Sequence, residues 1–196
     1  MFEIELKAHV ADRESIIKKL NSFADFAGKF ERHDKYWRKP MPDNPAQLIS
    51  ARIRKEISNG KETMFLTYKK KNIVTGKNGN SSEKNQEYES IINDSTAIDA
   101  LLSDLGFTIT DKKDKYVSRW EVSTKFGKAT LELCNIPPLG DFLEIEILSS
   151  SDDKNQTEII QNELYTLLEK SGIDKNQIEN RFYSQMLRER NICSTE

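Results

Sequence analysis

The chain has 196 residues, of which 32% are charged and 36% are hydrophobic. Thirty basic and 32 acidic side chains nearly cancel, and a net charge of −2 argues against binding to duplex nucleic acid. No long uncharged apolar run predicts a membrane-spanning helix, and the charged segment MFEIELKAHV does not fit a secretory signal, so we expect a cytoplasmic protein that binds no membrane. The length fits one domain, which we place at residues 1–190 and follow with a polar tail over 191–196.

Strands and amphipathic helices follow one another along the chain. A predicted strand over 2–10 precedes a helix that begins after Asp12 and carries an apolar stripe as far as Ala27. Asn59-Gly60 is typical of a hairpin turn and lies between two of the next strands. These four strands are predicted at 31–38, 49–58, 62–71 and 85–92.

The second half repeats this pattern. A helix after Ser95 is predicted to end at Gly106, and two further helices begin at Asn155 and at Asp174, the last running through Leu187. Between them lie predicted strands at 114–123, 127–134 and 141–149. Eight strands in mainly meander order with inserted helices predict an α+β fold with an antiparallel sheet or barrel.

Charges on the predicted strands are sorted by face and by sign. Alternation along strand 2–10 places Glu3, Glu5 and Lys7 on one face and only apolar residues on the other. The same alternation groups Arg52 with Arg54, Lys69 with Lys71, Glu87 with Glu89, Lys115 with Arg119, and Glu144 with Glu146. An open sheet would expose these faces to water. If instead the helices cover the apolar faces from outside, the sheet closes and the charges line a lumen.

A lumen lined with like charges predicts a ligand. Such charges repel one another and lose hydration, so they are stable together only when the cavity is filled. Clustered carboxylates suit a hard divalent cation, and clustered arginines and lysines suit a polyanion. A metal-bound polyphosphate satisfies both requirements.

The arrangement of these charged strands resembles a known superfamily. The motifs that carry the resemblance are EIELK at 3–7, HDKYW at 33–37, ARIR at 51–54, LTYKK at 66–70, EYE at 87–89, LELCNIPPLGDFLEIE at 131–146 and RFYSQML at 181–187. In this order they are similar to the CYTH superfamily, the triphosphate tunnel metalloenzymes that include class IV adenylyl cyclases and thiamine triphosphatases. The resemblance implies an eight-stranded, closed or nearly closed antiparallel β-barrel with amphipathic helices packed outside.

The resemblance also implies roles for individual residues. The implied ligands of Mg²⁺ or Mn²⁺ are Glu3, Glu5, Glu144 and Glu146, and the implied triphosphate-binding residues are Lys7, Arg52, Arg54, Lys69, Lys71 and Arg119. Of these, Glu5, Lys7 and Arg54 are expected to take part most directly in catalysis. Glu87 and Glu89 form a second carboxylate pair, which orients basic residues, holds a second metal ion or makes structural salt bridges.

Two positions depart from the family pattern. Cys134 stands where the family has an aspartate, and Glu132, two residues earlier on the same face, is expected to supply the missing carboxylate to the metal. Val117 stands where the family has a lysine, and Lys115 on the same face is expected to bind phosphate in its place.

The implied substrate is a small triphosphate such as ATP, tripolyphosphate or thiamine triphosphate. Two reactions stay open: conversion of ATP to cyclic AMP and pyrophosphate, which the similarity of Leu105-Gly106-Phe107 to the cyclase group favours, and hydrolysis of an inorganic or organic triphosphate. Hydrolysis is favoured because this sequence lacks the His-Phe pair that precedes EIELK in some cyclases. A non-catalytic nucleotide- or polyphosphate-binding module is the alternative function, and a homodimer is left open.

Overall fold

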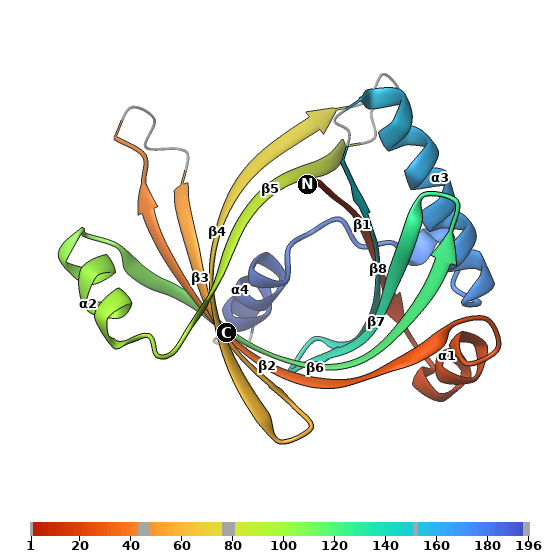
Figure 1. Ribbon diagram of the computed structural model, residues 1–196, viewed down its shortest axis with the longest axis horizontal. Coiled ribbons are helices and arrows are strands. Elements are labelled where there is room, and N and C mark those ends of the chain that lie inside the picture. The colour runs from red at the N-terminus through yellow and green to blue at the C-terminus, as the bar shows by residue number, and fades with distance from the viewer. Residues whose placement is uncertain (1, 43–47, 76–80, 151–152, 194–196) are drawn as a thin grey trace.

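The computed structural model describes the backbone of residues 2–42, 48–75, 81–150 and 153–193, and the side chains of these ranges except 69–75, 81–87, 154 and 191–193. Within these residues eight strands form one closed antiparallel barrel in the order β1-β5-β4-β3-β2-β6-β7-β8 (Figure 1). The strands are β1 (Phe2–Val10), β2 (Asp25–Pro40), β3 (Leu48–Ser58), β4 (Lys61–Thr75), β5 (Ser81–Ile92), β6 (Thr108–Thr124), β7 (Gly127–Ile136) and β8 (Gly140–Ser149). The predicted eight-stranded barrel is confirmed.

The ring closes because β1 pairs with a strand on each side. Its register with β8 runs without interruption from Phe2 opposite Ser149 to Val10 opposite Asp141. On the other side β1 meets β5 through only two residue pairs. The predicted turn between β3 and β4 is present, with Asn59 and Gly60 both at positive φ, which matches the right-handed twist of a two-residue hairpin.

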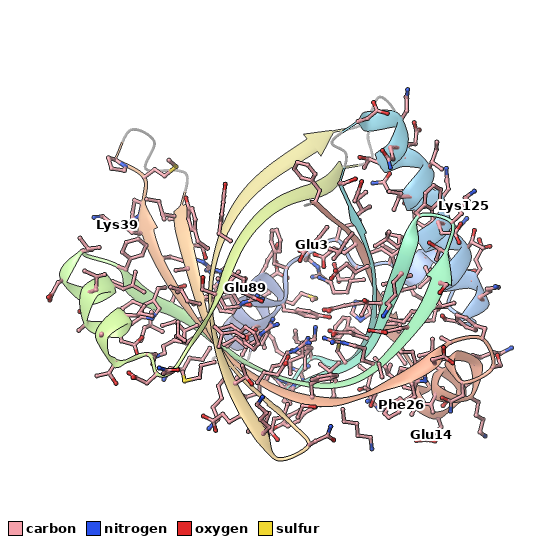
Figure 2. The ribbon with its side chains drawn as sticks, in the orientation of Figure 1. Glu3, Glu14, Phe26, Lys39, Glu89 and Lys125 are labelled. Atoms are coloured by element: carbon pink, nitrogen blue, oxygen red, sulfur yellow. The ribbon has the colours of Figure 1, made fainter. Side chains whose placement is uncertain are left out.

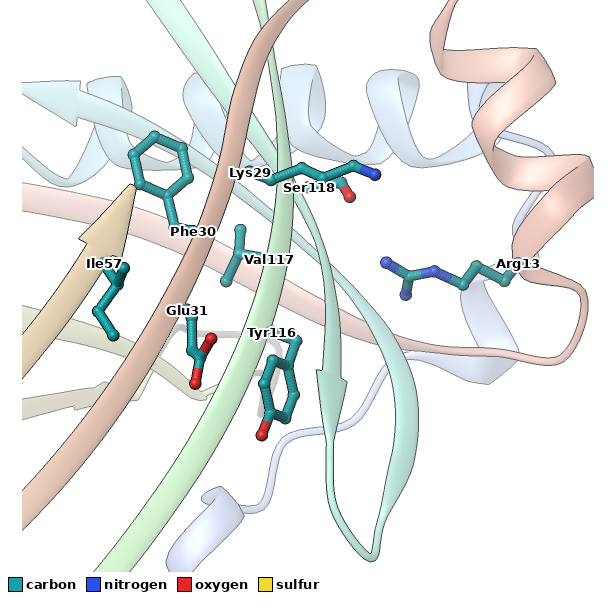
Figure 3. Close-up of a pocket in the computed structure, with 8 residues that line it drawn as sticks. All are labelled: Arg13, Lys29, Phe30, Glu31, Ile57, Tyr116, Val117 and Ser118. Atoms are coloured by element: carbon teal, nitrogen blue, oxygen red, sulfur yellow. The ribbon is translucent and has the colours of Figure 1, made fainter. Parts of the chain in front are cut away.

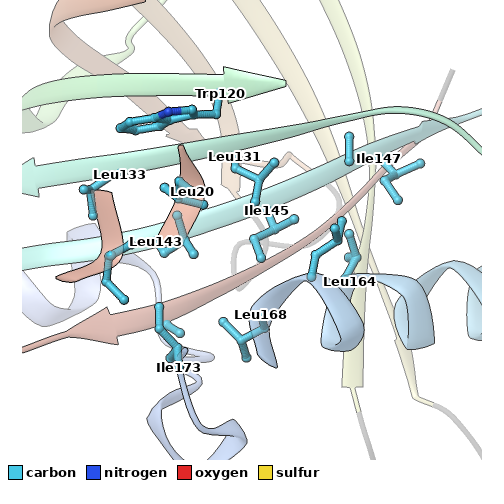
Figure 4. Packing of buried hydrophobic residues seen from close by; sticks show 14 of the residues in the cluster. Leu20, Trp120, Leu131, Leu133, Leu143, Ile145, Ile147, Leu164, Leu168 and Ile173 are labelled. Carbon is cyan, nitrogen blue, oxygen red and sulfur yellow. The ribbon is translucent and has the colours of Figure 1, made fainter. Parts of the chain in front are cut away.

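Two helices cover the outward face of β1, β7 and β8. They are α1 (Arg13–Leu20) and α3 (Lys154–Lys170). Leu20 of α1 and Leu164 and Leu168 of α3 are buried in one apolar cluster with alternate residues of the strands (Figure 4). The strand residues in this cluster include Ile4, Leu131, Leu133, Leu143, Ile145 and Ile147. Because side chains alternate along a strand, the charged residues between them point into the barrel.

A third helix, α2 (Thr96–Asp104), covers a separate part of the outer surface. Its Ile98 and Leu102 pack against a smaller buried cluster formed by Trp37 of β2 and Ala51 and Ile53 of β3. Ile53 alternates with Arg52 and Arg54, so this packing also turns the charged face of β3 inward. The prediction that helices cover the apolar strand faces from outside is confirmed for α1, α2 and α3.

The fourth predicted helix is interrupted. Asp174 caps only a short 3-10 helix, η1 (Lys175–Gln177), and a true helix, α4, spans Tyr183–Cys193. Between them Ile178 forms a β-bridge with Ala8, and the Glu179 amide donates to the Lys7 carbonyl oxygen at 2.8 Å. These backbone bonds to the edge of β1 compete with helical bonds and hold the segment extended.

α4 packs differently from the other helices. Its Tyr183 and Met186 contact Val117, Cys134 and Phe142, which belong to the inward face of β6, β7 and β8. In Figure 1, α4 accordingly lies within the outline of the ring.

Several helix and strand boundaries differ from the sequence prediction. α1 ends at Leu20, so Ala27 belongs to β2, because pairing with β6 begins at Asp25. The cap of α3 is Asp153 rather than Asn155, and its carboxylate accepts a hydrogen bond from the Gln156 amide. β2 and β6 both begin earlier than predicted, because they pair with each other from Asp25 opposite Glu121 to Arg38 opposite Thr108.

Candidate active site in the barrel lumen

Strand register brings the predicted acidic residues together inside the barrel. Glu5 on β1 lies opposite Glu146 on β8, and Glu144 lies opposite Lys7 on one side and Glu132 of β7 on the other. Figure 2 labels Glu3 within the ring of strands, together with Glu89 of β5. The residues proposed as metal ligands therefore line one wall, formed by β1, β7 and β8.

This wall holds more negative charge than it can accommodate alone. Burial, together with the nearby carboxylates of Glu3, Glu5, Glu132 and Glu144, raises the pKa of Glu146 to about 8. A divalent cation would relieve this repulsion, and carboxylate oxygens are the donors that Mg²⁺ and Mn²⁺ prefer. The residues present therefore fit the predicted ion, with Glu3, Glu5 and Glu146 as its nearest carboxylate donors along the register.

The opposite wall holds a buried aspartate, Asp34, between an arginine and a lysine. Asp34 of β2 accepts two hydrogen bonds from Arg54 of β3, at 2.7 and 3.0 Å, and its carboxylate lies 3.4 Å from the Lys113 ammonium. Burial would raise the pKa of Asp34, but Arg54 and Lys113 hold it well below its usual range. Asp34 thus occupies Nε and Nη2 of the Arg54 guanidinium and fixes its orientation.

Arg52 lies next to this group and has unused donor capacity. Its Nη2 donates to the Thr67 hydroxyl at 3.1 Å and to Glu89 at 3.4 Å, and Thr67 in turn donates to Glu89 at 2.7 Å. The Nε of Arg52 is buried and has no hydrogen-bond partner among the described residues. Glu89 therefore contacts Arg52 both directly and through Thr67.

Glu132 is surrounded by three cationic side chains. Its two oxygens accept hydrogen bonds from Arg32 at 2.7 and 3.0 Å, from Arg119 at 2.7 and 2.9 Å, and from Lys115 at 3.1 Å. Burial would raise the pKa of Glu132, but these three cations hold it well below its usual value. The predicted metal role of Glu132 is therefore in competition with an ion-pair role.

Lys115 contacts a second carboxylate as well. Its ammonium lies 2.5 Å from Glu144; Lys115 is buried and Glu144 is half-buried. Cys134 faces the same way, as predicted, and its thiol lies within 4.8 Å of ligand atoms of Glu132 and Glu144. Burial and the neighbouring carboxylates raise the pKa of the Cys134 thiol, so it is neutral near pH 7.

Lys7 stands where α4 enters the lumen. Its ammonium donates to the Arg181 carbonyl oxygen at 2.5 Å and lies 4.4 Å from the centre of the Tyr183 ring. Burial lowers the pKa of Lys7. Burial raises the pKa of Tyr183, and the nearby Glu144 carboxylate raises it further, so the hydroxyl is protonated near pH 7.

Sequence reasoning missed four lumen residues: Arg32, Asp34, Lys113 and Tyr183. Three of them could have been found by alternation. Arg32 and Asp34 lie two residues apart and share a face of β2, and Lys113 lies two residues before Lys115 on the same face of β6. The side chains of Lys69, Lys71 and Glu87 lie outside the described residues, although the backbone register places Lys69 opposite Glu87.

A hollow on the outside of the barrel is distinct from this lumen. It has a volume of about 370 Å³ and lies between Arg13 at the start of α1 and residues of β2 and β6 such as Glu31 and Ser118 (Figure 3). Glu31 and Ser118 belong to the outward faces of their strands, since they alternate with Arg32 and Arg119. The hollow gathers none of the predicted site residues.

Comparison with known proteins shows the family of the chain. The family model described as "CYTH domain" matches residues 1–183. This chain belongs to the CYTH domain family. Among curated proteins, no sequence matches the chain. The segments EIELK at 3–7 and FLEIE at 142–146 supply the carboxylates of the acidic wall in this CYTH domain.

Solved structures share the fold over nearly their whole length. The PH1819 protein of Pyrococcus horikoshii OT3 is 27% identical, with a TM-score of 0.77 over 96% of this chain and 99% of that one. A proposed adenylate cyclase of Vibrio parahaemolyticus is 16% identical, with a TM-score of 0.66 over 96% and 98% of the two chains. HpAC1 from Hippeastrum, a proposed adenylyl cyclase described as having a dominant triphosphatase activity, is 16% identical, with a TM-score of 0.62 over 96% and 95%.

Among the described residues, none of the helices has the length and apolar character needed to cross a bilayer.

Proposed function

We propose that this CYTH domain is a metal-dependent phosphoryl-transfer enzyme that hydrolyses the terminal phosphate of a small triphosphate. One observation carries the proposal: a single closed lumen has a wall of carboxylates on β1 and β8 facing arginines and lysines on β2, β3 and β6. A metal-bound polyphosphate is the ligand whose charges match both walls.

Substrate binding is assigned to the basic wall. Arg54 presents a fork that Asp34 already orients, and Arg52 has a buried Nε that lacks a partner among the described residues. Guanidinium groups match phosphate oxygens with two parallel hydrogen bonds, so these two residues would hold the phosphate chain in a defined direction. Lys7, Lys69, Lys71 and Arg119 keep the phosphate-binding roles that the sequence suggests.

The acidic wall would hold the metal ion through Glu3, Glu5 and Glu146. A bound Mg²⁺ or Mn²⁺ would neutralise charge that develops on phosphate oxygens. Phosphoryl transfer needs mainly positioning and charge neutralisation, and here the oriented arginines supply the first. Lys7, close to both walls, is suited to contact the phosphate that leaves.

Hydrolysis is proposed because it makes the smaller demand on the site. It requires the triphosphate, the metal and water, whereas cyclisation also requires a site that directs the ribose 3′-hydroxyl to the α-phosphorus. Conversion of ATP to cyclic AMP remains a second outcome that the same experiment can detect, since class IV cyclases resemble this chain.

Phosphorus NMR tests the proposal directly. The full chain is incubated with Mg²⁺ and either tripolyphosphate or ATP, and the products are identified by their resonances. Release of orthophosphate supports the proposal, cyclic AMP with pyrophosphate indicates the cyclase, and binding without turnover indicates the non-catalytic module.

A matched pair of variants links the activity to the lumen. Glu5→Gln is expected to lower the turnover rate by about 100-fold or more, as removal of one electrostatic participant does. Glu31→Gln, on the outward face of β2, is the control and should keep the wild-type rate. Equal rates in both variants would assign the activity to another part of the protein.

A further inference from the structure

Glu132, Cys134 and Glu144 bring three potential ligand atoms within 4.8 Å of one another, as the residues of a metal site do. The space between the two carboxylates is nevertheless taken by a side chain of the protein. The Lys115 ammonium lies 3.1 Å from Glu132 and 2.5 Å from Glu144, and only 5% of the surface of Lys115 is exposed.

Glu132 has little capacity left for a metal ion. Its two oxygens accept five hydrogen bonds, from Arg32, Lys115 and Arg119. A carboxylate offers about four lone-pair positions, so these donors saturate it. A metal ion could bind Glu132 only if a buried cation were displaced and left without its partner, which is costly.

The charges of this group are also balanced without a metal ion. Arg32 donates to Glu56 at 2.6 Å in addition to Glu132, which brings a third carboxylate into contact. The six joined side chains, Arg32, Lys115, Arg119, Glu56, Glu132 and Glu144, therefore carry three positive and three negative charges. A divalent cation added here would leave two uncompensated positive charges in a buried position.

We infer that the Lys115 ammonium occupies the place of a second divalent cation between Glu132 and Glu144, so that this tunnel binds one metal ion rather than two. The inference rests on the proposed function in one respect, which is that the single ion binds at Glu3, Glu5 and Glu146. Lys115 then acts as a positioning residue: it holds Glu144 and Glu132, and through Glu132 it fixes Arg32 and Arg119. This role replaces the phosphate contact expected of Lys115 from its sequence position.

Counting bound Mn²⁺ tests the inference without any turnover. The full chain, free of triphosphate, is titrated with Mn²⁺, and bound ions are counted from the electron paramagnetic resonance signal of the free ion. Wild type is expected to bind one ion per chain, and Lys115→Met is expected to bind two, because Glu144 loses the ammonium that occupies its carboxylate and the group is left with one uncompensated negative charge. Lys113→Met is the matched control: it removes a lumen lysine on the same strand that contacts Asp34, and it should bind one ion.

Two results overturn the inference: two ions bound to the wild type, or one ion bound to a folded Lys115→Met chain. Two ions bound to the wild type overturn the inference even if no variant folds. If Lys115→Met folds only when Mn²⁺ is present, that dependence supports it, and Lys115→Gln provides a second variant with the same expected count.

Failure of the inference is distinguishable from failure of the proposed function. One ion in the wild type and none in Glu146→Gln supports the assigned metal position. No ion in the wild type but one in Lys115→Met supports the role of Lys115 and overturns the metal assignment to Glu3, Glu5 and Glu146. One ion in the wild type, two in Lys115→Met and no cleavage of tripolyphosphate supports the inference and overturns the proposed hydrolysis.

Discussion

Replacing Asp34 by asparagine removes the only negative charge shown in contact with Arg54 among the described residues. The Asp34 side chain is fully buried, and it also accepts a hydrogen bond from the Tyr36 hydroxyl at 3.2 Å. Asparagine keeps the shape but leaves the Arg54 guanidinium and the Lys113 ammonium uncompensated in a low-dielectric site. We therefore expect Asp34→Asn to fold with markedly lower stability than wild type.

The size of the loss follows from the burial of the pair. Removing one partner of a buried ion pair costs about 3–5 kcal/mol. In a domain of this size 1 kcal/mol corresponds to about 2–4 °C in Tm, so Tm should fall by roughly 6–20 °C at pH 7. Because the pKa of Asp34 is lowered in the folded state, its stabilisation is present above the unfolded pKa of about 3.9 and is lost as pH falls, so wild type and variant should converge in acid.

Thermal unfolding in EDTA provides the measurement, and a second Asp–Arg pair provides the control. Asp141 accepts from Arg13 at 2.8 Å, but both side chains are about one quarter exposed. Asp141→Asn should therefore cost no more than about 1 kcal/mol. Added tripolyphosphate should raise Tm more in Asp34→Asn than in wild type, because phosphate oxygens replace the lost carboxylate. A Tm loss no larger than that of Asp141→Asn would refute the reasoning.

Three further predictions concern the acidic wall. In EDTA, Glu146→Gln should be more stable than wild type at pH 9, by on the order of 3 kcal/mol, and the two proteins should converge near pH 5. The reason is that a carboxyl with a pKa of about 8 when folded and about 4.5 when unfolded destabilises the fold as pH rises between these values. Parallel curves of Tm against pH for the two proteins would contradict this. Cys134→Asp should leave the Mg²⁺ concentration for half-maximal activity close to that of Cys134→Ser, because Cys134 lies with Glu132 and Glu144, where Lys115 occupies the space, and not beside Glu3, Glu5 and Glu146; a value about 10-fold lower in Cys134→Asp would place the ion near Cys134 instead. Triphosphate cleavage should stop in EDTA and return with Mg²⁺ or Mn²⁺, so turnover at full rate in the chelator would exclude the metal scheme.

Much of the barrel could be predicted from local patterns. Alternation of Ile4 and Leu6 with Glu3 and Glu5 is a property of a few neighbouring residues, and it determines which side chains share a face whatever the partner strand. The hairpin at Asn59-Gly60 likewise follows from its own two residues. The fourth helix failed because the apolar spacing after Asp174 does not reveal that Ile178 pairs with Ala8, more than 150 residues earlier in the chain.

Local patterns are enough to show that the charged residues share strand faces and that these faces differ in sign, because both features depend only on neighbouring residues. Only the tertiary structure decided which charges meet across the lumen. Glu132 contacts Arg32 from 100 residues away, and the register of β2 with β6 and of β6 with β7 sets that contact. The role of Lys115 depends on the same registers, because a shift of one residue would turn its side chain to the outer face. Whether a lumen carboxylate binds a metal ion or a protein cation is therefore decided by packing across the barrel.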